Sequence, residues 1–138
     1  MQRAIVQGFP GADVSVSIVW INMLPLDSEE MARVSAQIIE DPRVHHFYDP
    51  ERRAGKAIAG SLGGQDKIAW DMYLFYTKDS EWGNSPPMPV DWVHQLQGDS
   101  WADLARYHSG EDLIEELYRA MDGLPEWHSA QVQLGGLS

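Results

Sequence analysis

Residues 14–49 constrain the fold of this chain more than any other stretch. Val14–Ile21 is an apolar run that becomes apolar on both faces towards its end, which is typical of an interior strand of a helix-covered sheet. A helical pattern begins at Asp27, and after Pro42 a second strand is predicted at Val44–Tyr48. A strand, a helix and a strand in this order form two parallel strands joined by a right-handed crossover. The stretch therefore predicts an α/β fold.

The helix between these two strands carries its own start and stop signals. Asp27 and Glu30 form a capping box, in which acidic side chains accept from N–H groups that have no partner inside the helix. Pro42 ends the helix. Its apolar residues recur at helical spacing, so we expect them to face the sheet. They are Met31, Val34 and Ile38.

The chain continues with a second helix and a long strand. Asp49 and Pro50 are typical of a helix start, with Asp at the N-cap and Pro at the first helical position, and the helix is predicted over Arg52–Ser61. Ile68–Thr77 alternates over ten residues and is the clearest strand in the sequence. The proline-rich stretch Lys78–Pro89 predicts a stiff loop.

The last part of the chain predicts one more strand and a closing helix. Val90–Leu96 alternates as a strand, although Asp91–Gln97 also fits one helical turn. Ser109 caps a helix that ends at Gly123. The predicted order is thus β-α-β-α-β-β-α, with a mixed sheet of four or five strands flanked by helices. The first two strands are expected to be parallel and the last two antiparallel.

The length of 138 residues is typical of a single domain. Its core is expected over residues 14–122, with residues 1–13 as a lead-in and residues 123–138 as a tail. Trp20 and Trp70 lie on predicted strands, and we expect both in the core.

The composition excludes several classes of function. There are 10 basic and 21 acidic residues, a net charge of −11, whereas nucleic acids and anionic membranes both require a basic surface. The absence of cysteine excludes disulfides, thiol catalysis and thiolate metal sites. No apolar run reaches the roughly 20 residues of a membrane helix, and no signal peptide is recognisable. We therefore expect a cytoplasmic protein.

A family resemblance rests on four groups of residues together with the order of the predicted elements. The groups are Val19-Trp20 leading to Met23-Leu24-Pro25, Asp41-Pro42-Arg43-Val44 with Tyr48-Asp49-Pro50, Trp70-Asp71, and Asp91-Trp92-Val93-His94-Gln95-Leu96. The element order resembles the thioredoxin-like superfamily over residues 14–122. The four groups are similar to a set of bacterial thioredoxin-like proteins of unassigned function.

The chain departs from working thioredoxins at both parts of their redox site. Those proteins carry Cys-x-x-Cys at the start of the first core helix, where this chain has Met23-Leu24-Pro25-Leu26-Asp27-Ser28. They also carry a cis-proline before the third core strand, where this chain has Gly64-Gln65-Asp66-Lys67. The resemblance therefore implies the fold of a redox-inactive member, without thiol–disulfide activity and without a cofactor.

Acid–base chemistry would have to come from carboxylates and imidazoles, and the candidates are Asp71, His94 and His46. Asp71 lies within an aromatic strand, where a carboxylate either faces solvent at the rim or is buried with a perturbed pKa. Neighbouring His45 and His46 point to opposite faces of a strand, so they do not bind one ion together. No metal-ligand spacing occurs on a helix, and we predict no metal site.

A tryptophan in the long loop indicates a binding surface. Trp82 has no periodic reason to be buried, so it either anchors its loop or lies at the rim of such a surface. Met23, Leu24 and Pro25 lie in the turn after the first predicted strand, where an active relative would carry its Cys-x-x-Cys. The resemblance thus implies one partly exposed apolar surface, made of Met23, Leu24, Pro25, Trp82 and Met88.

Three functions remain open from the sequence. The leading one is a redox-inactive thioredoxin-like domain that binds an unknown protein partner or a small ligand. The second is a non-thiol enzyme that uses Asp71 with His94 and one of His45 or His46. The third is a structural subunit that forms a homodimer through an exposed strand.

Overall fold

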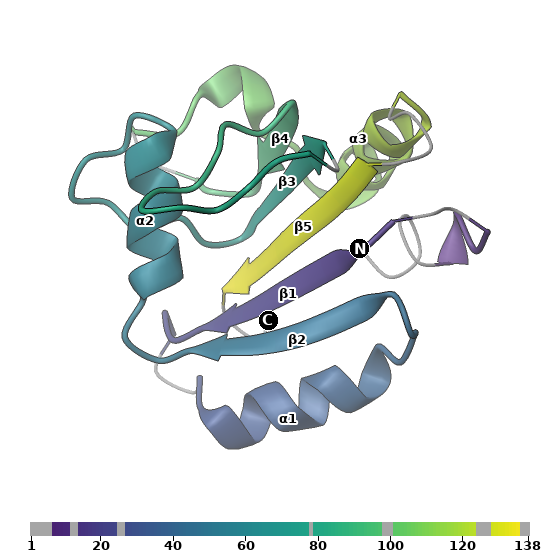
Figure 1. The fold of residues 1–138 in the computed structure, drawn as a ribbon, viewed down its shortest axis with the longest axis horizontal. Coiled ribbons are helices and arrows are strands. Elements are labelled where there is room, and N and C mark those ends of the chain that lie inside the picture. Colours follow the sequence, from purple (N-terminus) through teal and green to yellow (C-terminus); the bar gives the residue numbers. More distant parts are fainter. Residues whose placement is uncertain are drawn as a thin grey trace.

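The computed structural model describes residues 7–11, 14–24, 27–77, 79–97, 101–123 and 128–135. Within them, one mixed sheet is flanked by α-helices (Figure 1). The strands are β1 (Val16–Ile21), β2 (Val44–Asp49), β3 (Met72–Thr77), β4 (Asp91–His94) and β5 (His128–Gly135). The helices are α1 (Glu29–Ile38), α2 (Arg53–Ser61) and α3 (Gly110–Asp122), with a 3-10 turn at Leu104–Arg106. The α/β class predicted from the sequence is confirmed.

Both predicted strand pairs are present. Strands β1 and β2 run parallel, with Val16 opposite Val44, as a strand–helix–strand unit requires. Strands β3 and β4 run antiparallel, with Met72 opposite His94. Because Asp91–His94 is extended, the alternative of a helical turn there is wrong.

The sheet contains a fifth strand where a tail was expected. Strand β5 pairs in parallel with β1 and antiparallel with β3, so the order across the sheet is β2-β1-β5-β3-β4. The expectation of a tail over residues 123–138 is therefore wrong for residues 128–135. The four strands other than β3 all run in one direction.

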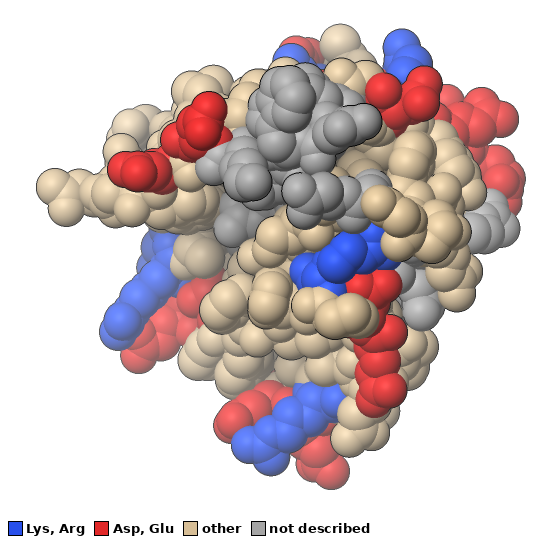
Figure 2. All heavy atoms as spheres, turned by 45° about the vertical axis from the view of Figure 1, so that its right-hand side comes forward, with Lys and Arg blue, Asp and Glu red and all other residues tan. Residues whose placement is uncertain are grey.

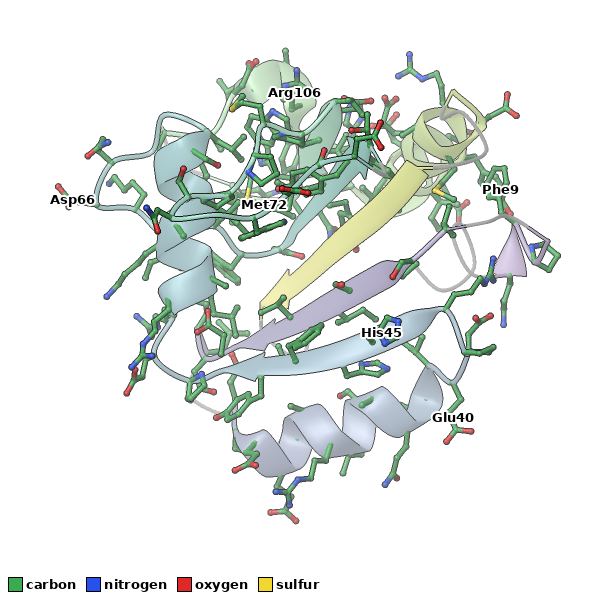
Figure 3. All side chains as sticks on the ribbon, viewed as in Figure 1. Phe9, Glu40, His45, Asp66, Met72 and Arg106 are labelled. Atoms are coloured by element: carbon green, nitrogen blue, oxygen red, sulfur yellow. The ribbon has the colours of Figure 1, made fainter. Side chains whose placement is uncertain are left out.

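Alternating side chains of the strands build a core on each face of the sheet. On one face, β1 and β3 pack against α1 and α3 through Ile18, Trp20, Phe75, Ala32 and Leu117. On the other face, β3 packs against α2 through Met72, Leu74, Ile58 and Ala59. Figure 3 shows Met72 on the side of the sheet where α2 lies. The sheet is thus the middle of three layers.

Helix α1 contacts the sheet through a different face from the predicted one. The expected stripe is on the solvent side, with Met31 41%, Val34 49% and Ile38 68% exposed. Ala32 is buried instead, and Ile39 packs against the core below it. Helix α1 thus has apolar residues on two faces, one exposed and one buried. The buried face carries Ala32, whose small side chain lets the helix lie close to the strands.

The caps of the first two helices also differ from the prediction. Ser28 is the N-cap of α1, and its hydroxyl accepts from the amide of Met31. The Asp27 carboxylate instead accepts from the amides of Met23 and Leu24, at 2.9 and 2.6 Å, and so holds the turn after β1. Asp27 is therefore a turn residue, and the predicted capping box does not form.

Helix α2 begins at Arg53, later than the Asp49–Pro50 signal predicted. Asp49 is the buried last residue of β2, and its carboxylate accepts from the amides of Arg53, Ala54 and Gly55 at 2.9, 2.9 and 3.3 Å. Arg52 takes a left-handed conformation with φ 60° to make this connection. Asp49 thus caps the helix from outside it.

Several arginines form ion pairs with neighbouring acidic side chains. Figure 2 shows basic side chains on one face lying next to acidic ones, and the pairs Arg33–Glu29 and Arg43–Asp41 have N–O distances of 2.8 and 3.0 Å. Among the described residues, no helix combines the length and the apolar character needed to cross a membrane.

Candidate functional site

One cavity lies at the edge of the sheet where β3 begins and β4 ends. Its volume is about 590 Å³, and we call it the Asp71 pocket. The carboxyl ends of β1, β2, β4 and β5 point to the same edge, because β3 alone runs the other way. Ligands of open α/β sheets commonly bind outside the carboxyl ends of the parallel strands. The lining residues are Trp70, Asp71, Gln95, Leu96, Gln97, Tyr107 and Ser109.

Asp71 lies just before β3, which starts at Met72 and not at Ile68 as predicted. Its left-handed backbone, with φ 55°, interrupts the extended conformation that a longer strand would need. The carbonyl of Asp71 accepts from the amide of Gln95, and its Oδ1 accepts from Gln95 Nε2, both at 3.0 Å. These two contacts fix the carboxyl group at the wall of the pocket.

The surroundings of Asp71 oppose its ionisation. Burial raises the pKa of the carboxyl group, while the hydrogen bond from Gln95 lowers it by less. Burial also raises the pKa of neighbouring Tyr73, and the charge of Asp71 adds to that effect. Asp71 combines the two interpretations, because it is partly exposed at the wall of the pocket while burial still raises its pKa. Perturbed carboxyl groups in cavities are typical of functional sites.

The raised pKa makes the contribution of Asp71 to stability depend on pH. A folded-state pKa above the unfolded value near 3.8 favours folding at low pH, and this contribution is lost as the pH rises through the folded-state pKa. We expect Asp71→Asn to raise the urea midpoint at pH 7, because Asn keeps an acceptor for Gln95 and carries no charge. The gain should disappear below pH 3.8. A lower midpoint for the variant at pH 7 would contradict this expectation.

Trp70 and His94 lie next to Asp71 but differ in burial. Trp70 is partly exposed and lines the pocket, so the expectation that it belongs to the core is wrong. His94 is completely buried, between the rings of Trp92 and Tyr107. Its side chain does not line the pocket.

Both ring nitrogens of His94 are occupied by the backbone. The amide of Leu96 donates to Nδ1 at 3.1 Å, so the proton of the neutral ring is on Nε2, which donates to the carbonyl of Asp103 at 2.8 Å. These bonds hold the connection between β4 and the 3-10 turn. Acid–base chemistry would have to break one of them.

His46 has an equivalent arrangement under α1. Trp20 Nε1 donates to its Nδ1 at 3.1 Å, and its Nε2 donates to the carbonyl of Ile39 at 3.1 Å. The two rings are stacked, with an interplanar angle of 11°. The three acid–base candidates therefore do not line one cavity, and Asp71 alone of them lines the pocket. Among the described residues, no group of three His, Asp or Glu side chains could hold a metal ion.

A second cavity, the Trp82 groove, lies on the face of the sheet that α2 covers. Its volume is about 360 Å³. Its apolar walls come from β1, β2, β3, α2 and the loop between β3 and β4, with Asp49 and Arg53 at its margin. Trp82 is 44% exposed and its ring lies 6.1 Å from that of Tyr76. The apolar residues are Val19, Phe47, Ala54, Ile58, Leu74 and Trp82.

Of the five residues of the expected apolar surface, Trp82 is the one that lines this groove. Leu24 is 40% and Met88 64% exposed, Met23 is partly buried, and Pro25 lies outside the described residues. The groove contains one exposed aromatic residue that the sequence analysis did not single out. Phe47 is 54% exposed on the edge strand β2, although it lies on the same face of the sheet as α2. Nothing in the sequence around Phe47 distinguishes it from a core residue.

Comparison of the chain with protein-family models, with curated proteins and with solved structures found no match.

Proposed function

We propose that this protein is a redox-inactive thioredoxin-like domain that binds a small apolar ligand in the Trp82 groove. Two observations support the thioredoxin-like part. The elements follow the order β-α-β-α-β-β-α as far as α3, and α1 and α3 pack on the face opposite to α2. The chain contains no cysteine, so its function does not depend on thiol exchange.

The proposal of ligand binding rests on the composition and volume of the groove. Its exposed aromatic side chains Trp82 and Phe47 border walls made of Val19, Ile58 and Leu74. Aromatic side chains left in contact with water at a concave apolar site gain free energy when a ligand covers them. The volume of 360 Å³ lies near the lower end of the range of about 300–1,000 Å³ for small-molecule sites. A small molecule therefore fits better than a peptide.

The polar groups at the margin favour an uncharged ligand. The Asp49 carboxylate already accepts three amides of α2, and the guanidinium of Arg53 forms an ion pair with exposed Glu51. A charged ligand would have to displace one of these partners. A flat aromatic molecule needs neither the carboxylate nor the guanidinium as a partner, and it can stack on Trp82.

The proposal is tested with 2-naphthol as the probe. Its binding should shift the NMR signals of the Val19, Ile58 and Leu74 methyl groups, and Trp82→Ala should weaken the binding about tenfold, since an aromatic contact and its buried area are lost. Met88→Ala is the matched control, because Met88 is an exposed apolar residue of the same loop that does not line the groove.

Three results would argue against this function. If saturating probe leaves the three methyl signals unchanged, the groove does not bind. If Met88→Ala weakens binding as much as Trp82→Ala, the ligand covers the wider apolar surface. If light scattering shows that wild type is a dimer and Trp82→Ala a monomer, a second copy of the chain occupies the groove.

A further inference from the structure

We infer that the Asp71 pocket is a second binding site, which takes a small organic cation with an alkylammonium or guanidinium group. The inference does not depend on the ligand of the Trp82 groove, because the two cavities share no lining residue. Its basis is a carboxyl group that has no cationic partner among the described residues, in a cavity of about 590 Å³.

The carboxyl group of Asp71 is only partly satisfied by the described residues. Oδ1 accepts from Gln95 Nε2, whereas Oδ2 has no hydrogen bond to any of them. None of the described lining residues is Lys or Arg. The neighbouring His94 has both ring nitrogens bonded to the backbone. A partly buried carboxylate without a counter-ion is unfavourable, and a bound cation would supply the counter-ion.

The other polar groups of the pocket complete a site for a hydrogen-bond donor. Gln95 gives its Nε2 to Asp71 and Gln97 gives its Nε2 to the Tyr107 hydroxyl at 2.6 Å, so the carbonyl oxygen of each amide remains as an acceptor. Ser109 is the N-cap residue of α3, but its hydroxyl makes no capping hydrogen bond and is available to accept as well. Ammonium and guanidinium groups carry several N–H donors and no acceptor, which matches this set.

Trp70 gives the same wall an aromatic surface. The face of an indole ring attracts cations that lie within about 6 Å of its centre. The same contact already occurs within this protein, where the guanidinium carbon of Arg106 lies 4.9 Å from the ring centre of Trp92. A carboxylate beside an indole ring thus favours an organic cation in two ways.

The pocket suits an organic cation better than a metal ion or an anion. Among the described residues the pocket has one lining carboxylate, whereas Ca²⁺ takes six to eight oxygen ligands. The volume also exceeds what a single ion needs. An anion would meet Asp71 with no basic residue beside it among the described lining residues, in a protein of net charge −11.

The matched pair of variants is Asp71→Asn and Asp66→Asn. Both residues are aspartates in the left-handed region, with φ 55° and 60°, which Asn tolerates well. Both changes remove one negative charge. Asp66 is exposed and does not line the pocket (Figure 3). Any difference between the variants therefore reports on the pocket and not on the net charge.

The experiment titrates n-butylamine hydrochloride into ¹⁵N-labelled protein, with 1-butanol as the neutral control. We expect the side-chain amide signals of Gln95 and Gln97 to shift with saturation in wild type and in Asp66→Asn. Asp71→Asn should weaken binding at least tenfold, and 1-butanol should leave these signals unchanged. Butylguanidine hydrochloride in place of the amine shows which of the two cations binds more tightly.

Several outcomes would overturn the inference. Equal affinity of Asp71→Asn and Asp66→Asn would show that the carboxylate does not bind the amine. Equal shifts with 1-butanol would indicate a site for neutral polar molecules. Gln97→Ala, which leaves Asp71 in place, should also weaken the binding. An unchanged affinity would show that Gln97 does not contact the amine. Trp82→Ala should bind the amine like wild type, which separates this test from that of the groove.

Discussion

Replacing Trp20 with alanine should lower the free energy of unfolding by about 3–5 kcal/mol, as large aromatic deletions in cores do. The indole is 7% exposed and packs in the core between the sheet, α1 and α3. The change also removes the donor to His46 Nδ1, which leaves an acceptor of a partly buried ring without its partner. Urea denaturation followed by circular dichroism measures the loss.

Trp82→Ala is the control for this prediction because it makes the same chemical change at an exposed site. Its 44% exposed ring should contribute less than about 1 kcal/mol to stability. If Trp20→Ala and Trp82→Ala lower the free energy of unfolding equally, Trp20 does not belong to the core.

Replacing Asp49 with alanine should destabilise the protein by about 2–3 kcal/mol. The carboxylate is 9% exposed and accepts from the amides of Arg53, Ala54 and Gly55. Losing an N-cap acceptor costs about 0.5–2 kcal/mol, and buried donors left without a partner add to that cost. The backbone of Gly55 packs tightly against β1, since a Cβ built on Gly55 would lie 2.5 Å from Ile21 Cδ1. This packing leaves the Gly55 amide little room to move towards another acceptor.

Two further variants test whether the lost hydrogen bonds explain the effect of Asp49→Ala. Asp49→Asn keeps one acceptor oxygen and should fall between wild type and Asp49→Ala. Glu51→Ala removes an exposed acid next to the same helix, and we expect a change within about 0.5 kcal/mol. If Glu51→Ala is as destabilising as Asp49→Ala, the charge near the helix N-terminus matters and the three hydrogen bonds do not.

The parallel pair β1–β2 and the antiparallel pair β3–β4 were predictable because their signals are local. An apolar run, a helical pattern and Pro42 are sufficient for the first pair, and alternation is sufficient for the second. Strand β5 also has a local signal, since apolar residues at positions 130, 132 and 134 alternate with glutamines. The position of β5 between β1 and β3 has no local signal, because pairing between distant segments is set by the whole sheet.

The differences at the candidate sites have different causes. The start of β3 depends on the left-handed backbone of Asp71, which is held by Gln95, the residue after β4. The sequence does not reveal that these two residues are close, because they are 24 positions apart. The start of α2 depends on a local contact, in which the Asp49 carboxylate reaches past Arg52 and replaces the predicted N-cap. The exposure of Phe47 depends on its place on the edge strand β2, which the sequence does not reveal either.

The position of β5 has a consequence for how the protein is made. A ribosome releases a chain from its N-terminus onwards, yet the strand that joins β1 to β3 is the last of the five to be synthesised. Until then, the edges of β1 and β3 that face each other across this gap are open to pairing with other chains. The nascent chain can therefore complete this sheet only after its last strand has left the exit tunnel. Until that time, other nascent chains on the same messenger RNA are the nearest competitors for the open edges of β1 and β3.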